Sequence, residues 1–148
     1  LLLETIMEKF GIRDCNCASL RKAARRLTSF YDGQLAPSGL RATQFAILAL
    51  VNEMEEVSVN AIAERLGLDR TTAGKNLRPL EQSGFVEVTS AKHDGRQRAI
   101  RVTKAGHAAL KVAVPLWRRA QERFEAANGP EKAAALRDTL RSMEFEPQ

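Results

Sequence analysis

The stretch that most limits what this chain can fold into runs from Ser58 to Thr103. Two short segments in it have apolar residues at helical spacing and are separated only by residues 67–69, and the remainder alternates apolar and polar residues. Ser58 and Asp69 are residue types that favour helix N-termini, and Gly67 is the type that most often ends a helix. The stretch therefore predicts two helices joined by a tight turn, followed by a two-stranded hairpin.

The predicted hairpin has strands over residues 85–89 and 98–103, with a loop over residues 91–97. The dipeptide Asp94-Gly95 lies in the loop and is common in tight turns. The period of two predicts strands, since one face of each segment is apolar. The alternating apolar residues are Val86, Val88, Ile100 and Val102.

The second helix of the pair contains two residues that oppose a helix. Pro79 has no backbone N–H and its ring clashes with the carbonyl of Lys75, so we expect the helix to bend or to end early there. Gly74 weakens the helix by roughly 1 kcal/mol relative to alanine.

The rest of the chain is predicted to be helical. Helices are expected over residues 15–35, 43–54 and 104–127, with a last helix from Pro130. Thr43 and Thr103 are the expected N-caps of the second and third of these, and Pro115 predicts a kink in the third. The segment 43–54 is apolar on almost every side, which predicts a buried central helix. The expected fold class is mainly α with a small β-hairpin.

Length and composition favour one globular domain over residues 1–148. The hydrophobic fraction is 44%, and the longest apolar run, from Ala46 to Val51, is far too short to span a bilayer. We see no secretory signal, and two closely spaced cysteines do not make a disulfide framework. We therefore expect a cytoplasmic protein without a membrane partner.

The positive charge is concentrated in the same stretch. Between Arg65 and Lys104 there are nine Lys/Arg and four Asp/Glu, so this quarter of the chain carries the whole formal net charge of +5. A local excess of cations beside a helix that can enter a groove is typical of proteins that bind nucleic acids.

A helix, a tight turn, a second helix and a basic hairpin together predict a winged helix-turn-helix, in which the hairpin is the wing. The N-terminal half of the second helix fits the DNA major groove, while Arg96 at the wing tip, oriented by Asp94, suits the minor groove. The alternative is a solvated charged helix face and a surface ion pair. The expected DNA-contacting residues are Arg70, Thr71, Thr72, Lys75, Asn76 and Arg78 in the helix, and Lys92, Asp94, Arg96 and Arg98 in the wing.

Two sequence segments resemble the MarR family of transcriptional regulators. HDGRQRAIRVTKAG is similar to that family's wing, with D-x-R, a strand, Val-Thr and a glycine three residues on, and IAERLGLDRTTAGKNLRPLEQSGFVE is similar to its helix-turn-helix. The resemblance covers about residues 17–145. Gly74 departs from the family, which usually has a bulkier residue there, so base readout is expected to differ at that position.

The resemblance implies a homodimer. Dimerisation helices would come from residues 1–36 and 104–148, and residues 40–103 would form the winged helix-turn-helix. The long apolar faces of these terminal helices independently exceed what one small domain can cover. Two wings would straddle a near-palindromic site, and family members are commonly repressors released by a small, often aromatic, ligand or by thiol oxidation.

By the same resemblance, a ligand pocket would lie between the dimerisation helices and the DNA-binding region. An aromatic pocket with one guanidinium suits a small aromatic carboxylate. The alternative is that Tyr31 and Trp117 are ordinary core residues. The residues expected to line such a pocket are Arg25, Tyr31, Leu40, Gln44 and Trp117.

Cys15-Asn16-Cys17 lies at the start of a predicted helix, where the helix dipole favours a thiolate. A redox or metal sensor is one interpretation, and ordinary packing is the other. Two cysteines are too few ligands for zinc, and His93 and His107 are remote in sequence, so we expect no metal site.

These patterns favour a sequence-specific DNA-binding transcriptional regulator. No phosphate-binding loop, metal-spaced cluster or nucleophile motif is visible, so neither an enzyme nor a cofactor is expected. Two alternatives stay open. One is a thiol redox protein that uses Cys15 and Cys17, and the other is an architectural protein that binds DNA without sequence preference.

Overall fold

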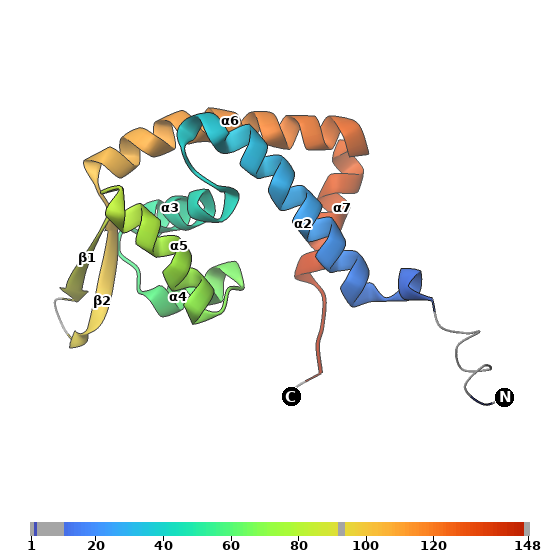
Figure 1. Ribbon diagram of the computed structural model, residues 1–148, viewed down its shortest axis with the longest axis horizontal. Coiled ribbons are helices and arrows are strands. Elements are labelled where there is room, and N and C mark those ends of the chain that lie inside the picture. The colour runs from blue at the N-terminus through green and yellow to red at the C-terminus, as the bar shows by residue number, and fades with distance from the viewer. Residues whose placement is uncertain (1, 3–10, 92–93, 147–148) are drawn as a thin grey trace.

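The computed structural model describes residues 2, 11–91 and 94–146, with the backbone alone for 91 and 94–97. Helices dominate and one antiparallel hairpin is present, so the predicted fold class is confirmed (Figure 1). No helix in these ranges is both long and apolar enough to cross a membrane. The elements are η1 (Ile12–Asp14), α2 (Asn16–Leu35), η2 (Ala36–Ser38), α3 (Ala42–Met54), α4 (Val59–Leu66), α5 (Arg70–Gln82), β1 (Val86–Ala91), β2 (Asp94–Val102), α6 (Lys104–Asn128) and α7 (Pro130–Arg141).

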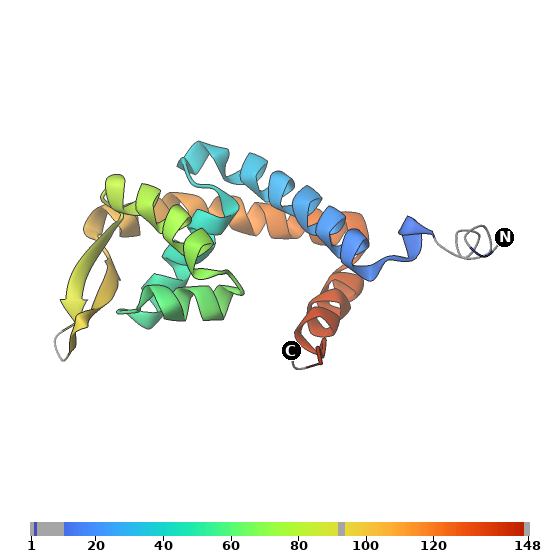
Figure 2. The same cartoon turned by 60° about the horizontal axis from the view of Figure 1, so that its bottom comes forward.

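The helices and strands fall into two groups. Residues 40–103, with α3, α4, α5 and the hairpin, form a compact group at one end, which we call the winged region (Figure 1). We call α2, α6 and α7 the outer helices. Helix α6 runs from the hairpin across the molecule, α2 packs along it, and α7 turns back from its far end (Figures 1 and 2).

Helix α3 is the centre of the winged region. Phe45, Ile47, Leu48 and Val51 are all buried, which confirms the predicted central helix. Full burial of one such side chain stabilises a fold by about 1.5–3 kcal/mol. The largest fully buried side chains are Leu35, Ile47, Leu48, Val51, Ile62, Leu80 and Ile100. All but Leu35 lie in the winged region, so the core is centred there, and Leu35 of α2 with Leu110 and Ala113 of α6 complete it.

The outer helices leave apolar side chains uncovered. On α7, Leu136 and Leu140 are each 44% exposed, although Ala133 beside them is buried. The exposed large apolar residues are Leu2, Ile12, Leu20, Val112, Leu136, Leu140, Met143 and Phe145. None of these lies in the winged region.

The predicted N-cap of α3 is wrong. The helix begins at Ala42, and Thr43 is its second residue. The backbone N–H of Ala42 donates to Oδ1 of Asp32 at 2.7 Å, from the neighbouring helix α2. A carboxylate that is distant in sequence thus fills the position that local pattern assigned to Thr43.

Neither internal proline ends its helix. Helix α5 continues through Pro79 to Gln82, so the expected early end is wrong. Leu77 and Leu80 on either side of Pro79 are buried, and their packing offsets the cost of about 3 kcal/mol for an internal proline. Helix α6 likewise continues through Pro115, and Figure 1 shows it arched along its length. The expected helix start at Pro130 is confirmed.

The hairpin strands are longer than expected. Val86 pairs with Val102 and Val88 with Ile100, but the register then shifts and Ala91 pairs with Asp94. The predicted loop over residues 91–97 is therefore wrong, because β2 already begins at Asp94 and an irregularity after Ser90 absorbs the extra residues.

Candidate DNA-binding surface

Three local devices build the helix-turn-helix. Ser58 Oγ accepts the N–H of Ala61 at 3.1 Å and so caps α4. Gly67 ends α4 with φ of 63°, a left-handed conformation that glycine adopts without strain. The N–H of Leu68 then donates to the carbonyl of Ala63 at 2.8 Å, which closes the turn. The predicted caps and turn are confirmed.

Asp69 fixes the first turn of α5. Its Oδ1 accepts the N–H of Thr72 at 2.8 Å, and its Oδ2 accepts the hydroxyl of Thr72 at 2.6 Å. The hydroxyl hydrogen bond first, and the backbone one second, lower the pKa of the Asp69 carboxyl below its ordinary value. Both hydrogen bonds favour the charged carboxylate, which suits the positive end of the helix dipole.

Helix α5 has an apolar inner face and a cationic outer face. Ala73, Leu77 and Leu80 are buried as predicted. Of the predicted contact residues on α5, Arg70, Thr71, Lys75 and Arg78 are exposed, while Thr72 and Asn76 are half-buried. Three cations thus lie on one exposed helix that is anchored to a complete core.

Two of the predicted contact residues already make hydrogen bonds within α5. The hydroxyl of Thr72 donates to Asp69, and Nδ2 of Asn76 donates to the carbonyl of Thr72 at 2.9 Å. Asn76 must rotate away from that carbonyl before it can pair with adenine through both amide atoms.

The wing is described only in part. Arg98 is exposed and lies opposite Ser90 in the ladder. Lys92 lies outside the described residues, and so do the side chains of Asp94 and Arg96. The expected minor-groove contact therefore stays a prediction.

A cation of the hairpin holds the wing in place. The guanidinium of Arg101 donates to the carboxylate of Glu56 through both Nε and an Nη, and this contact raises the pKa of Arg101. Beside it, the N–H of Ile100 donates to the carbonyl of Val57 at 2.8 Å, and the N–H of Val57 donates to the carbonyl of Ile100 at 3.2 Å. These contacts tie the connection between α3 and α4 to β2. Sequence reasoning missed them, because their partners lie more than 40 residues apart.

Gly106 lets α6 approach the base of the wing. A Cβ at this position would lie 2.1 Å from the carbonyl oxygen of Phe85, which no side chain can accept. Thr103 completes the junction, since its N–H donates to the same carbonyl at 3.0 Å and its Oγ1 caps α6 by accepting the N–H of Gly106 at 3.1 Å. The predicted cap is confirmed, and the glycine has a packing reason that the sequence motif did not reveal.

Three of the residues expected to line a ligand pocket are already packed or hydrogen-bonded within the protein. Leu40 is buried, and Trp117 stacks on Phe45 with ring centroids 6.1 Å apart. Gln44 Oε1 accepts the N–H of Arg41 at 3.1 Å.

The two outermost of these residues lie on α2. Arg25 is exposed, whereas Tyr31 is half-buried and donates its hydroxyl to Gln121 on α6. Burial first, and the charge of Glu125 second, raise the pKa of Tyr31. A ligand that enters here has to displace some of these contacts.

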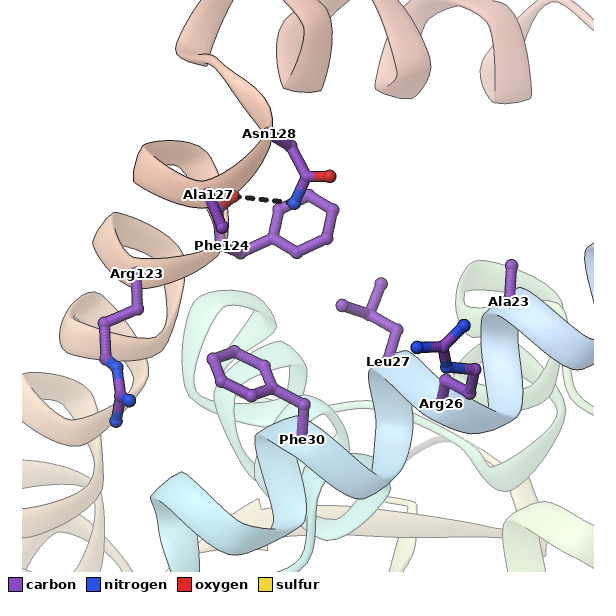
Figure 3. Close-up of a pocket in the computed structure, with 8 residues that line it drawn as sticks. All are labelled: Ala23, Arg26, Leu27, Phe30, Arg123, Phe124, Ala127 and Asn128. Atoms are coloured by element: carbon purple, nitrogen blue, oxygen red, sulfur yellow. Dashed lines mark hydrogen bonds between the residues drawn. The ribbon is translucent and has the colours of Figure 1, made fainter.

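A hollow of about 490 Å³ lies farther along the outer helices, between α2 and α6. Leu27 and Phe30 from α2 lie on one side of it and Phe124 from α6 on the other (Figure 3). It contains none of the five expected pocket residues. Its full lining is Ala23, Arg26, Leu27, Phe30, Arg123, Phe124, Ala127 and Asn128.

The two cysteines are free thiols at the start of α2. Cys15 is the N-cap residue, and its Sγ accepts the N–H of Ala18 at 3.4 Å. Cys17 is exposed.

An exposed cationic helix, a tight turn before it and an antiparallel hairpin after it define a winged helix-turn-helix DNA-binding protein. Comparison with known proteins agrees. The model of the MarR family matches residues 38–97. The transcriptional regulator MosR of M. tuberculosis, solved in complex with DNA, is 36% identical, with 89% of this chain and 100% of that chain covered and a TM-score of 0.72. The chain belongs to the MarR family of transcriptional regulators, which are not enzymes.

Two curated relatives are also similar. The regulator TtmR of Methylorubrum extorquens is 34% identical over 90 residues, which are 61% of this chain and 46% of TtmR. This chain therefore matches about half the length of that relative. The organic hydroperoxide resistance transcriptional regulator of Bacillus subtilis is 28% identical over 114 residues, with 77% of this chain and 78% of the relative covered.

Proposed function

We propose that this protein is a homodimeric, sequence-specific transcriptional repressor that binds a near-palindromic DNA site. The observation that carries the proposal is the outer face of α5, where Arg70, Lys75 and Arg78 are exposed together on a helix anchored by Leu77 and Leu80. Such a helix fits the major groove of B-DNA, where Arg and Lys can donate to guanine O6 and N7.

Four of the predicted contacts have specific roles in the proposed complex. Arg70 and Lys75 are proposed to read bases, and Asn76 to pair with adenine after it leaves the carbonyl of Thr72. Arg98, which is exposed on β2, is proposed to contact the phosphate backbone. The remaining proposed DNA contacts are Thr71, Thr72 and Arg78 on α5 and Lys92, Asp94 and Arg96 in the wing.

The outer helices support the proposed homodimer. Leu136 and Leu140 are half-exposed on α7, and the hollow beside Phe30 and Phe124 has no occupant from the described part of the same chain. A two-fold dimer would present its two α5 helices to half-sites one DNA turn, about 34 Å, apart. A dimer on such a site would cover it and exclude other proteins, which is how we propose that it represses. It would act where the chromosome lies, which for its bacterial relatives is the cytoplasm.

A small aromatic anion is the proposed effector. Trp117 of α6 stacks on Phe45 of α3, where an outer helix meets the winged region. We propose that a ligand held there by Trp117, Arg25, Tyr31, Leu40 and Gln44 would shift one group of elements against the other. Isothermal titration calorimetry with simple aromatic acids tests this directly. If the acids give no heat and no loss of DNA binding, the effector proposal is wrong.

Selection of bound duplexes from a random pool tests the DNA-binding proposal. We expect a palindromic sequence to be enriched, and Arg70→Ala or Lys75→Ala to weaken its binding by about ten-fold or more while relaxing preference at one base pair. Lys132→Ala, an exposed cation on α7, is the matched control and should leave binding unchanged. If bound DNA shows no enriched sequence and affinity follows salt alone, the protein is an architectural DNA binder instead.

Thiol-based redox sensing is a second candidate function. It is favoured by Cys15, whose Sγ accepts the backbone N–H of Ala18 at the start of α2, two residues before the exposed thiol of Cys17. The similarity to a regulator named for organic hydroperoxide resistance also supports it. In this reaction two thiols lose two protons and two electrons to form one disulfide between subunits, because strain disfavours a direct bridge between Cys15 and Cys17 across one residue. The hydroperoxide O–O bond breaks to give an alcohol and water.

The double variant Cys15→Ser/Cys17→Ser separates the two candidates. If thiols are the sensor, peroxide lowers the DNA affinity of the natural protein and leaves that of the variant unchanged. If neither peroxide nor copper changes the affinity of the natural protein, the redox candidate is excluded.

A further inference from the structure

The central helix of the winged region is capped by a residue of an outer helix. The N–H of Ala42, the first residue of α3, donates to Oδ1 of Asp32 on α2 at 2.7 Å. Arg41 occupies the N-cap position itself, and an arginine side chain has no hydrogen-bond acceptor. Asp32 thus does for α3 what Ser58, Asp69 and Thr103 do locally for their helices.

Capping is the principal contact of the Asp32 carboxylate among the described residues. The guanidinium of Arg41 is 4.0 Å from Oδ2, beyond hydrogen-bond distance, and its side chain is 78% exposed, so that pair contributes little. The Asp32 side chain is only 29% exposed. A carboxylate at this place also lies at the positive end of the α3 dipole.

This hydrogen bond joins the two groups of elements. Between Asp32 and Ala42 the chain passes through η2 and a left-handed turn at Gly39, with φ of 76°. The cap is therefore a direct link across that turn. A rotation of the winged region that moves the start of α3 away from α2 would lengthen or break it.

We propose that Asp32 is a positioning residue that sets the separation of the two α5 helices in the dimer, and hence the spacing of half-sites that the protein accepts. This inference rests on the proposed homodimeric DNA binding. A duplex with the wrong spacing can be bound only if each winged region turns relative to its outer helices, which breaks two caps per dimer. Without the caps, binding a duplex with the wrong spacing no longer costs the free energy of breaking them. Base recognition by α5 is unchanged.

Three variants distinguish positioning from mere stability. Asp32→Ala removes the acceptor, while Asp32→Asn keeps an oxygen at Oδ1 and is a comparable N-cap. Ser58→Ala removes a cap of similar geometry, 3.1 Å from the N–H of Ala61, but inside the winged region. It is the matched control because it leaves the link between the two groups intact.

The DNA probe is the palindromic duplex selected by the natural protein, together with versions that carry one or two extra base pairs at the dyad. We expect the natural protein, Asp32→Asn and Ser58→Ala to prefer the original spacing equally. Loss of two ordinary caps should reduce that preference about ten-fold in Asp32→Ala. The inference is wrong if Asp32→Ala keeps the full preference for the original spacing. It is also wrong if Ser58→Ala loses as much of that preference as Asp32→Ala does.

A second measurement needs no DNA. A spin label is placed on α5 by Glu81→Cys in a Cys15→Ser/Cys17→Ser background, and the distance between the two labels of a dimer is measured by double electron–electron resonance. Asp32→Ala should broaden the distribution, and Asp32→Asn should restore its width. Equal widths in all variants overturn the inference. If the labelled protein with Asp32 intact gives no dipolar signal, the dimer is absent and this inference falls with it. A normal signal with no selected DNA sequence removes only the proposed operator binding.

Discussion

The winged region and the outer helices differ in how completely one chain buries them. Among the described residues, six of the seven largest fully buried side chains belong to the winged region, and the large apolar side chains that stay exposed all lie outside it. The winged region also receives its bracing from within, through the pair of Glu56 and Arg101 and the bridge between Val57 and Ile100.

The difference teaches where each part obtains its stability. A core that is closed within one chain folds without a partner, whereas half-exposed leucines on a helix are typical of an unformed interface. The DNA-binding surface should therefore be a rigid unit, and its spacing in a dimer should depend on the outer helices and on their link through Asp32.

The largest expected effect is on assembly. Leu136→Asp/Leu140→Asp places charges on the exposed face of α7, and each charge would appear twice in the proposed two-fold interface. We expect the dimer dissociation constant to rise by about 100-fold or more, as measured by sedimentation equilibrium, while the circular dichroism of the monomer stays helical. Glu131→Ala, on the same helix, should change neither. A double variant that unfolds outright would contradict the claim that the core is closed within one chain.

A core substitution should instead lower the stability of the single chain. Ile47→Ala removes a fully buried side chain from α3 and should lower the free energy of unfolding by about 3 kcal/mol in urea titration. Measured in the same monomeric background, Leu20→Ala should cost less than about 0.5 kcal/mol, because its side chain is 40% exposed. Similar losses of unfolding free energy in Ile47→Ala and Leu20→Ala would contradict the contrast between the winged region and the outer helices.

Two glycines give a smaller and matched comparison. Gly106→Ala should destabilise the protein by about 2 kcal/mol, because the new Cβ meets the carbonyl of Phe85. Gly74→Ala should instead stabilise it by about 0.5–1 kcal/mol, because nothing lies within 4 Å of a Cβ there and alanine favours helix. Thermal unfolding of both variants checks the sign of each stability change. A Gly106→Ala variant as stable as the natural protein would mean that α6 is not packed closely against the carbonyl of Phe85.

The smallest effect concerns acid stability. The folded-state pKa of Asp69 is lowered from its ordinary value of 3.8, so its contribution to stability is present above that value and is lost as the pH falls through the folded-state pKa. We expect the difference in melting temperature between the natural protein and Asp69→Asn to shrink below about pH 4. A difference that is constant from pH 3 to 6 would show that the hydrogen bonds to Thr72 do not depend on the charge.

Local signals predicted much of this fold, and contacts between distant residues account for the rest. Ser58, Asp69 and Thr103 each cap a helix through an N–H three residues ahead, so their roles could be inferred from spacing alone. The cap on α3 could not, because its acceptor, Asp32, lies ten residues away on another helix.

The candidate site was predicted in outline but not in its internal hydrogen bonds. The exposed cations of α5 follow from helical periodicity, since the inner face is apolar. The engagement of Asn76 with the carbonyl of Thr72, and of Arg101 with Glu56, depends on side-chain geometry that no sequence pattern encodes. Sequence counting therefore overstated the number of cations open to DNA.

The molecular mass of the complex with the selected palindromic duplex tests the central claim most directly. Native mass spectrometry should find two chains on one duplex, with the Leu136→Asp/Leu140→Asp variant reduced to a single chain bound far more weakly. One chain of the natural protein on the full site, bound as tightly as on a half-site, would contradict the account.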